Sequence, residues 1–526
     1  MAHAAPAIAA GAPFLVMLVT LAVQRPAITA YGDRAVTALE VRDLLRGHQL
    51  LGAYSRFGWH HPGPAFLLPL AAADVVLGGA HWALDAGMLA AGAVVAAALV
   101  LVVGRAAGAA TAIVAAGILG LYVRSVGASV LRDPWNPWAT LLAVALLTVL
   151  CGAAGAGSVA ALAGSVLVAS VIVQTHLAAA PVALGLLVTA GVLAGWARRR
   201  GAGPGRVRSP WRRPSAWVPL ALAGAIWVPP LIQEATGSDP NLTDLWRFFV
   251  DGHPGHNLAT TVGAVGDRLG QFPLGSPAHF LTTWTDGGWN HAGGSIATVA
   301  AYLGAGAALA FIGHRRQDDF VRALGVLTVV AVITGLVAVH TAEGPLQGFV
   351  IGWVTAIPIG CWVGVVALVA GWTRPRLSRS AGDVPALAVA AAIAVLGLGL
   401  GTGSALAAPS AAGESAPDVS RAWAQLSPRL AGRPAGAVLL AVDDQSDWPV
   451  QAGLALEVEE HGWKAHVADN WVFMFGPARR ETGSETLVAT VHHVATGGTR
   501  LTVSTPLRPD ALRAAAAHIA SVLGAP

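Results

Sequence analysis

The residues best suited to chemistry lie between the apolar segments of this chain. Asp33 follows Gly32 and opens a helical pattern that Gly47 closes. Within it Asp33 and Glu40 share one helix face, roughly 10 Å apart along the axis. A carboxylate in such a position can act as a general base toward a hydroxyl group. The structural alternative makes Asp33 an N-cap and Glu40 an ion-pair partner on a solvated helix.

A second group follows within twenty residues and combines a cation, an aromatic ring and two imidazoles. Arg56, Trp59, His60 and His61 directly precede the stiff turn Pro62-Gly63-Pro64. Arginine binds phosphate through two parallel hydrogen bonds, and imidazoles can donate to the same group. Trp59 is a candidate substrate contact or an anchor at the membrane interface. The histidines could also be helix caps or metal ligands, although two histidines make an incomplete zinc site.

Further polar residues interrupt the apolar sequence downstream. Arg132 and Asp133 precede Pro134, so Asp133 is a second candidate acid, or an N-cap at the start of a helix. Polar residues in such a setting need partners inside the protein or water. We therefore expect His176 and Arg132 to contact phosphate, and we expect substrate contacts from Trp59, Gln174, Gln233, Glu234 and Glu343.

No metal motif is evident among these residues. The histidines of the segment 233–295 occur without HExxH or HxH order, which excludes a recognisable zinc motif there. Cys151 and Cys361 both lie in apolar runs, so neither a disulfide framework nor a CxxC site is expected. The sequence establishes no cofactor, and a divalent ion, Mg²⁺ or Mn²⁺, stays open.

The elements that must position these residues are membrane helices. The 526 residues are 55% hydrophobic and 11% charged, with a mean hydropathy of +0.62, whereas soluble domains carry about 25% charged residues. Because a span needs about 20 apolar residues, the sequence predicts about eleven spans, near 8–25, 84–104, 106–123, 137–154, 157–173, 177–196, 216–232, 296–313, 321–339, 349–372 and 385–407. The first apolar run is expected to stay as a span.

The orientation depends on the segment 64–80, which is apolar but contains Pro64, Pro69 and Asp74. If this segment is interfacial and the N-terminus is cytoplasmic, the dense arginine clusters fall inside, as the positive-inside rule requires. These clusters are Arg105, Arg198 to Arg213, Arg315-Arg316 and Arg374 to Arg379. The first outer loop (26–83), the long outer loop (233–295) and the C-terminus are then extracytoplasmic. The arginines also explain the pI of 9.6 without any nucleic-acid partner.

The last hundred residues differ in character from the rest. The segment 1–407 forms the predicted transmembrane domain, 408–417 is a linker rich in Ala, Gly, Ser and Pro, and 418–526 reads as a small extracytoplasmic α/β domain. Strands are predicted at Ala437–Val442, Trp471–Phe475, Thr486–His492 and Leu501–Ser504, and a helix at 509–523. These strands show no catalytic motif.

The first outer loop resembles that of the GT-C superfamily of polyprenyl-phosphate-sugar glycosyltransferases. Relatives include the protein O-mannosyltransferases, the aminoarabinose lipid A transferases and the mycobacterial arabinofuranosyltransferases. The resembling features are Gly32-Asp33, the helix to Gly47, the turn His61-Pro62-Gly63-Pro64 before an interfacial helix, and Asp133. Two features depart from the family pattern: Arg34 follows Asp33 where a second acid is usual, and the turn is Pro-Gly-Pro.

The resemblance implies a function in the cell membrane. Asp33 would be the base of an inverting transfer, Asp133 a secondary acid, and Arg56 and His61 contacts of the donor phosphate. The donor would be a sugar linked to polyprenyl phosphate, and the acceptor a glycan, lipid or protein of the cell envelope. A single lysine, Lys464, among 32 basic residues suggests the coding bias of actinobacteria.

Two other functions remain compatible with the sequence. A transporter or lipid flippase would place charges in mid-span and break helices in pairs, whereas these spans are nearly free of charge at their centres. A non-catalytic membrane scaffold with an outer domain explains the topology. It does not explain why acids, imidazoles and arginines gather in the outer loops.

Overall fold

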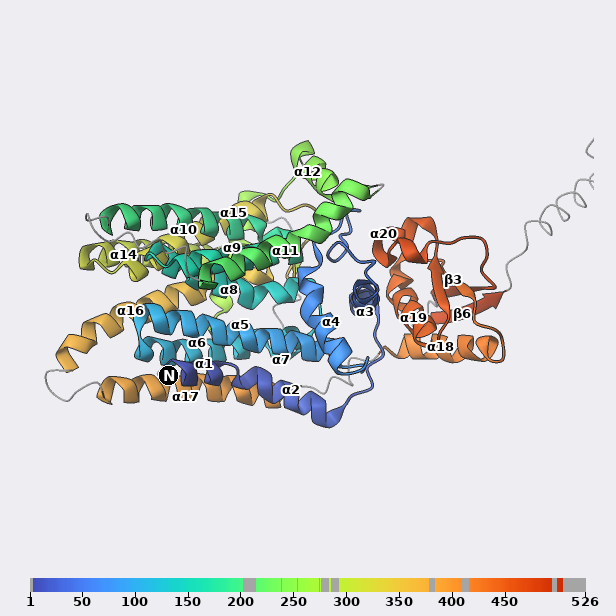
Figure 1. The fold of residues 1–526 in the computed structure, drawn as a ribbon, viewed down its shortest axis with the longest axis horizontal. Helices are drawn as coiled ribbons and strands as arrows, with labels where there is room; N and C mark the ends of the chain where they lie inside the picture. The colour runs from blue at the N-terminus through green and yellow to red at the C-terminus, as the bar shows by residue number, and fades with distance from the viewer. Residues whose placement is uncertain are drawn as a thin grey trace, which may run out of the picture. The chain divides into compact units, whose positions relative to one another are not determined.

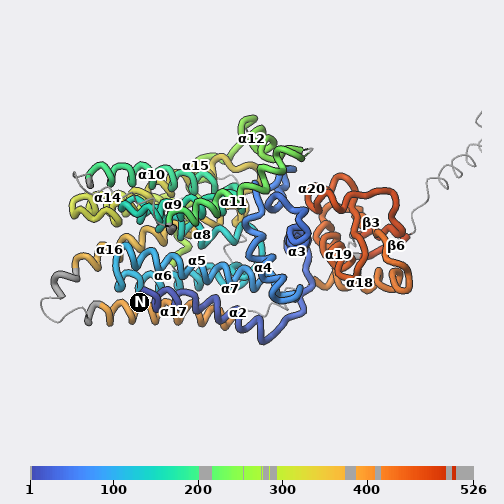
Figure 2. Tube along the Cα trace, viewed as in Figure 1, coloured from blue at the N-terminus to red at the C-terminus, as the bar shows by residue number. Residues whose placement is uncertain are grey.

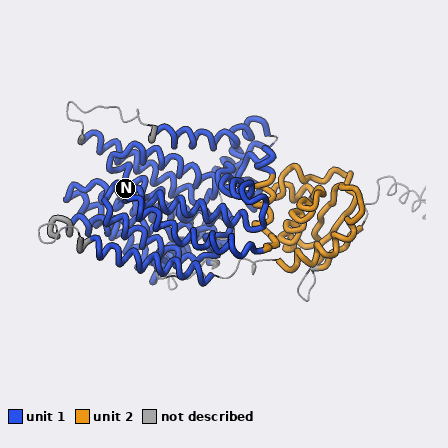
Figure 3. Tube along the Cα trace, turned by 60° about the horizontal axis from the view of Figure 1, so that its bottom comes forward, with its two compact units in different colours: residues 1–26, 43–410 blue, residues 27–42, 411–526 orange. Residues whose placement is uncertain are grey.

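Long α-helices dominate the fold, which we describe from a computed structural model (Figure 1). The structure describes residues 3–201, 214–237, 239–252, 254–273, 275, 283–284, 293–377, 384–408, 416–493 and 499–504. The helices divide between two compact units, coloured separately in Figure 3. The first comprises 1–26 and 43–410, and the second comprises 27–42 and 411–526.

The first unit contains the predicted membrane helices. Among the described residues nine helices are long and apolar enough to span a bilayer. They are α5 (Ala83–Ala107), α6 (Ala109–Val126), α8 (Asn136–Gly155), α10 (Ala180–Gly201), α11 (Pro214–Thr236), α14 (Gly293–Arg316), α15 (Asp319–His340), α16 (Ile357–Leu377) and α17 (Val384–Leu406). They run alongside one another in Figure 2. The protein is therefore a multi-pass membrane protein.

Two further predicted spans correspond to less regular helices. The helices α1 (Ala4–Ala10) and α2 (Ala12–Gln24) form a pair bent by 48°. The helix α9 (Val159–Thr175) has 17 residues, the lower end of the length that can cross a bilayer. All eleven predicted spans thus coincide with helices, although which side of the membrane each end faces stays a prediction.

The segment 64–80 forms a short helix. The 3₁₀ turn η1 (Pro64–Phe66) leads into α4 (Leu67–Val76), whose 10 residues extend roughly 15 Å. This length is about half the thickness of the hydrocarbon core of a bilayer, so α4 is too short to cross it. In Figure 1 α4 also runs at a steep angle to α5. Both observations favour the interfacial interpretation.

Glycine permits the closest helix packing in this unit, between α6 and α17. A Cβ atom at Gly397 would lie 2.2 Å from the carbonyl oxygen of Gly117, and one at Gly401 2.5 Å from that of Gly120. The backbones are therefore in direct contact, as small residues allow in membrane helices. Cys151 and Cys361 are buried free thiols of this unit.

The long segment 233–295 contains two amphipathic helices, α12 (Asn241–Asp251) and α13 (Leu258–Gln271). The strand β1 (Thr283–Trp284) pairs antiparallel with β2 (Leu346–Gln347), which follows α15. The buried guanidinium of Arg268 lies 4.7 Å from the ring centre of Trp284. His253, Trp289 and His291 lie outside the described residues.

The second unit is an α/β domain with a mixed four-stranded sheet of order β4-β3-β5-β6. The strands are β3 (Ala437–Val442), β4 (Lys464–Val467), β5 (Leu487–His493) and β6 (Thr499–Ser504), and the helices include α18 (Pro417–Leu430) and α19 (Trp448–Glu460). Strand β3 is parallel to both neighbours, and only β6 is antiparallel. The α/β prediction is confirmed.

Some details of the second unit differ from expectation. Trp471–Phe475 is helical (η9, Asp469–Trp471, and α20, Val472–Phe475), because its apolar side chains pack as a turn rather than alternate. The strand β4 was not predicted, because Lys464 and His466 are two of its four residues and leave no apolar run in the sequence. The predicted helix 509–523 and residues 409–415 of the linker lie outside the described residues.

The helix α3 (Gly32–Leu45) changes the predicted division of the chain. Most of it belongs to the second unit, although it precedes that unit by hundreds of residues. The amide of Ala416 donates to the carbonyl of Thr29 at 3.2 Å, and Arg42 pairs with Glu460 at 2.6 Å. A Cβ at Gly453 of α19 would meet the carbonyl oxygen of Ala30 at 2.7 Å.

Candidate functional site

Residues 52–61 of the first unit fold back on themselves and present four of the predicted site residues. The amide of Gly52 donates to the carbonyl of His61 and that of His61 to Ala53, each at 2.9 Å. At the tip the amide of Ser55 donates to Trp59 at 2.8 Å, with Gly58 at φ +87° in the turn. The hairpin ends at the Pro62-Gly63-Pro64 turn, so it fixes the two histidines relative to that turn.

His61 and His176 form a buried imidazole pair, with ring centres 5.5 Å apart. The amide of Leu177 donates to Nδ1 of His61 at 3.2 Å, so Nδ1 is an acceptor. Nε2 of His176 lies 3.1 Å from the carbonyl oxygen of Val350, which makes that nitrogen the donor. Backbone groups therefore assign the proton to Nε2 in both neutral rings.

The environment keeps both imidazoles uncharged. Burial lowers the pKa of His61 well below its usual value, and the neighbouring His176 and His60 lower it further. Burial lowers the pKa of His176 to about 4, although its hydrogen bond to Val350 acts in the opposite direction. At neutral pH the pair offers hydrogen-bonding groups without positive charge.

Gln174 packs directly against the Pro-Gly-Pro turn. A Cβ at Gly63 would lie 2.4 Å from Oε1 of Gln174, so a larger residue between the two prolines would displace the Gln174 side chain. The amide nitrogen of Gln174 donates to the carbonyl of Ile226 at 3.0 Å. Oε1 is buried and has no hydrogen-bond partner within the described part of the chain. Gln174 therefore supports the turn and holds an acceptor inside the protein.

The other predicted polar contacts position α12 beside the hairpin. Asn241 at the start of α12 pairs with the backbone of His60 in both directions, at 2.8 and 2.9 Å. Gln233 accepts from the amide of Asn241 at 3.2 Å, and Glu234 accepts from the amide of Leu242 at 2.8 Å. Gln233 and Glu234 thus cap the helix that holds His60, a structural role for two predicted substrate contacts.

Aromatic rings strengthen the same connection. The ring of Phe248 on α12 lies 5.1 Å from that of Phe57 and 5.5 Å from that of Trp59. The ring of Trp59 lies 5.5 Å from His61, edge to face. Trp59 is buried, so it acts as a packing residue between α12 and the imidazole pair.

Arg56 lies at the exposed tip of the hairpin. It donates to the backbone carbonyl of Glu343 at 3.2 Å, and its guanidinium lies 5.0 Å from the ring centre of Phe57. Gly344 is at φ +74°, and a Cβ there would meet the guanidinium at 2.8 Å. The structure therefore brings together Arg56 and the backbone of Glu343, which are far apart in sequence.

Asp133 and Arg132 lie between α7 (Ala128–Arg132) and α8. Asp133 is not the N-cap of α8, because Trp135 occupies that position. Its carboxylate accepts the indole N–H of Trp138 at 3.2 Å. Arg132 is buried beside it. A half-buried acid is thus fixed by an aromatic side chain from the first turn of a membrane helix.

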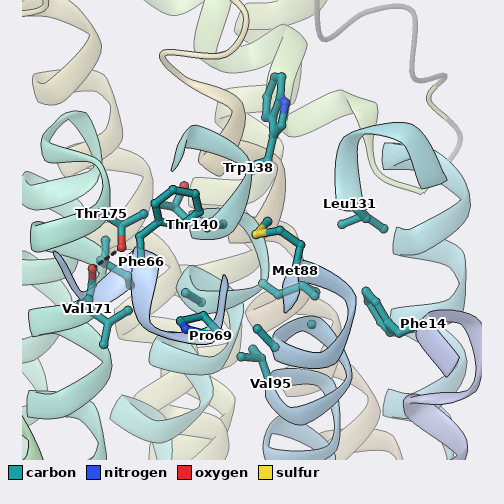
Figure 4. A pocket seen from close by; sticks show the side chains of 17 residues that line it. Phe14, Phe66, Pro69, Met88, Val95, Leu131, Trp138, Thr140, Val171 and Thr175 are labelled. Atoms are coloured by element: carbon teal, nitrogen blue, oxygen red, sulfur yellow. Dashed lines mark hydrogen bonds between the residues drawn. The ribbon is translucent and has the colours of Figure 1, made fainter. Parts of the chain in front are cut away.

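Trp138 also lines an apolar cavity of about 120 Å³ within the first unit. Figure 4 shows its lining side chains, which come from α2, α4, α5, α7, α8 and α9. The hydroxyls of Thr140 and Thr175 bond to the carbonyls of Pro137 and Val171, at 2.6 and 2.7 Å. Because its polar groups are satisfied, the cavity suits hydrocarbon.

Asp33 and Glu40 belong to the second unit. Asp33 lies in the first turn of α3 rather than at the N-cap, where its charge is favourable to the helix dipole. Gly32, at φ +56°, packs against Trp448 and Pro449 of α19. Glu40 is buried. The two predicted catalytic acids therefore lie on a helix that packs with the C-terminal domain.

One polar cluster in the second unit escaped the sequence analysis. His492 on β5 bonds to the carboxylate of Asp443 through Nδ1, and Nε2 accepts from the hydroxyl of Thr502 at 2.7 Å. Asp443 follows β3, from which the chain continues to β4 on one side, whereas the next strand, β5, lies on the other side of β3. The cluster therefore lies where the strand order changes direction, a topological switch point. Residues at the carboxyl ends of predicted strands were the signal that could have found it.

The described residues contain no group of three or more His, Cys, Asp or Glu side chains that could hold a metal ion. All the predicted site residues of the first unit fall into two sets. One set surrounds the hairpin and comprises Arg56, Trp59, His60, His61, Gln174, His176, Gln233, Glu234 and Glu343. The other comprises Arg132 and Asp133, which follow Leu131 of the cavity lining.

No protein-family model matches this chain, and no curated protein does. Among solved structures, the chain is similar to the crystal structure of ArnT from Cupriavidus metallidurans in the apo state. The similarity covers 92% of this chain and 93% of that one, with 14% sequence identity and a TM-score of 0.49. At this level of similarity a shared activity does not follow.

Proposed function

We propose that the protein is a membrane glycosyltransferase that moves a sugar from a polyprenyl-phosphate donor to a hydroxyl group of a cell-envelope acceptor. The observation that carries the proposal is an apolar cavity that is connected to Asp133 through Trp138. Trp138 lines the cavity and holds the carboxylate of Asp133 by its indole N–H. A hydrocarbon site among membrane helices next to an acid fits a substrate with a lipid tail and a polar head.

The size of the cavity sets what it can hold. Apolar cavities of about 150 Å³ bind a molecule as small as benzene, so about 120 Å³ accommodates one short branched segment of a prenyl chain. The rest of the chain would lie along the lipid-exposed surface. A prenyl chain can be divided in this way because each buried CH₂ group contributes about 0.8 kcal/mol to the binding free energy, whatever the rest of the chain contacts.

The roles in the proposed chemical step are those that the resemblance to the GT-C superfamily implies. Asp33 deprotonates the acceptor hydroxyl, whose oxygen attacks the anomeric carbon with inversion, and the prenyl phosphate leaves. Arg56 and Arg132 supply the positive charge for the leaving phosphate. His61 contributes its Nε2–H as a neutral donor, since burial lowers its pKa, whereas His176 supports His61, because its own Nε2–H is bound to the carbonyl of Val350. Asp133 supports the acceptor side as a second acid.

The test uses the full-length protein in liposomes with short-chain prenyl-phosphate sugars, including arabinofuranose and mannose donors. The measurement is release of prenyl phosphate that depends on added oligosaccharide acceptor. Asp33→Asn and Asp133→Asn are each expected to lower it by about 10²-fold or more, because general-base catalysis contributes 10²–10⁴-fold. Asp74→Asn on α4 is the matched control and should retain activity.

Different results reject different parts of the proposal. Full activity of Asp33→Asn rejects that residue as the base. Movement of the donor across the liposome bilayer without sugar transfer favours the transporter alternative.

A further inference from the structure

A buried guanidinium lies at the other end of the helix bundle from the imidazole pair. Arg322, in the first turn of α15, is 4% exposed. Its Nη1 pairs with Asp319 at 2.6 Å. Nε and Nη2 have no hydrogen-bond partner among the residues that the structure describes. These two nitrogens form the edge through which arginine holds phosphate or carboxylate.

A second arginine shares the same aromatic neighbour. The guanidinium of Arg322 lies 4.1 Å from the ring centre of Trp196, and that of Arg200 lies 3.5 Å from it. The two guanidinium carbons can therefore be no farther apart than those two distances combined. One phosphate group can bond to two cations at such a separation. Without an anion the two cations repel each other in a partly dehydrated site.

The surrounding charges favour an anion. His314 stacks on Trp196 with ring centres 6.5 Å apart, and Arg315 and Arg316 follow at the end of α14. The nearby acids are already engaged, since Asp318 caps α15 through the amide of Val321 and Asp319 pairs with Arg322.

An exposed apolar stripe leads to this site along α10. Val188, Val192, Trp196 and Arg200 are spaced by four residues, so each is adjacent to the next along the surface of α10. Val188 and Val192 are 66% and 67% exposed, as expected of side chains that face lipid tails. Tryptophan and arginine at the end of such a stripe lie where headgroups begin. The arrangement matches a molecule with an acyl chain and a phosphate.

We propose that Arg322 and Arg200, gathered around Trp196, bind the phosphate of an anionic membrane phospholipid whose acyl chain lies along Val188 and Val192. The site is separate from the proposed catalytic function, because Arg200 and His176 lie at opposite ends of α10, roughly 30 Å apart. Basic pockets between membrane helices recognise acidic lipid headgroups in this way.

The experiment uses the full-length protein in a neutral detergent. Dioleoylphosphatidylglycerol or dioleoylphosphatidylcholine is added, and native mass spectrometry counts the bound lipids while thermal unfolding gives Tm. For the natural chain, phosphatidylglycerol should bind in preference and raise Tm by several degrees more than phosphatidylcholine. Arg200→Gln and Arg322→Gln should reduce the bound phosphatidylglycerol several-fold and remove most of that difference in Tm.

Two matched variants separate the site from general charge effects. Arg105→Gln removes an exposed arginine at the end of α5 and should retain the preference. If Arg322→Gln does not fold, Arg322→Lys replaces it, because lysine keeps the charge but lacks the two-donor edge. Arg322→Lys and Arg200→Gln, each as a single variant, should then both weaken the binding of phosphatidylglycerol. Equal loss in Arg105→Gln, or full retention in Arg200→Gln, overturns the proposal.

A further arm distinguishes the source of the phosphate. Inorganic phosphate at millimolar concentration should neither raise Tm nor displace phosphatidylglycerol, because it lacks the acyl chain that contacts α10. If inorganic phosphate reproduces the stabilisation fully, the site binds a free anion and the lipid assignment is wrong.

Discussion

At the scale of single residues, the hydrogen bonds of the two buried histidines define their chemistry more closely than their position does. Leu177 and Val350 offer backbone groups that fit only one neutral tautomer of each ring. A charged imidazole would lose the bond from Leu177, because a protonated Nδ1 cannot accept. The pair therefore resists protonation for a geometric reason as well as through burial.

His176 makes stability depend on pH. Its pKa falls from the usual 6.5 to about 4, so the unfolded chain binds the extra proton between these values. The stability contributed by the neutral ring is thus present above pH 6.5 and is lost as the pH falls toward 4. At about 1.4 kcal/mol per pKa unit, the loss approaches about 3 kcal/mol.

His176→Gln tests this prediction, because the Gln amide can replace Nε2 as donor to Val350 but does not titrate. The thermal unfolding temperature in detergent should fall less between pH 7 and pH 5 in this variant than in the natural chain. Identical pH dependence of the two proteins would assign the effect to other groups.

Residue types could be predicted for the first unit, but their partners could not. The sequence identified His61 and His176 as polar residues in apolar surroundings, and the structure places them together. It gave no sign that Gln233 and Glu234 cap α12, because that contact depends on how the chain turns between α11 and α12. The cluster of Asp443, His492 and Thr502 was missed because its members lie on three different strands or strand ends.

At the scale of elements, glycine positions limit how the helices pack. Gly397→Val on α17 would place a side chain against the carbonyl of Gly117, because even a Cβ atom at this position would lie only 2.2 Å from that oxygen. We expect separation of α6 and α17 and a loss of at least about 1–3 kcal/mol, the usual cost of overpacking. Gly399→Val on the same helix has nothing within 4 Å of its Cβ and is the control. Tm in detergent should fall for the first variant only, and an equal fall in both would contradict this account.

The helices were predictable because a bilayer demands about twenty apolar residues in sequence, a local property. The short helix α4 was recognisable for the same reason, since Pro69 and Asp74 interrupt its apolar run. The strand β4 and the helical turn at Trp471–Phe475 depend on packing against the rest of their domain. Patterns of four or five residues do not distinguish such elements.

At the scale of the whole molecule, the second unit is discontinuous in sequence. Hydrophobic patterning assigned 27–42 to an outer loop of the membrane domain, and only non-local contacts reveal that it packs with α18 and α19. Asp33 and Glu40 are therefore held by contacts to residues almost four hundred positions later. The predicted catalytic helix and the C-terminal domain form one structural unit.

Gly453→Val tests this dependence. A Cβ at Gly453 would lie 2.5 Å from the side chain of Val419 and 2.7 Å from the carbonyl of Ala30, so valine should loosen the segment 27–42. We expect faster proteolytic cleavage within 27–42 under native conditions, while the membrane helices remain intact. Unchanged cleavage would show that α3 is held by other contacts.

The discontinuity of this unit also concerns the order of synthesis. The ribosome completes Arg42 long before it reaches Ala416 and Glu460, which later bind the same short segment. At a synthesis rate of about 5–20 residues per second, roughly 20–80 s pass between the synthesis of Arg42 and that of Glu460. During that interval newly made chains lack the contacts that Thr29, Ala30 and Arg42 make in the folded protein, so chaperones that act on nascent chains have a defined segment to protect.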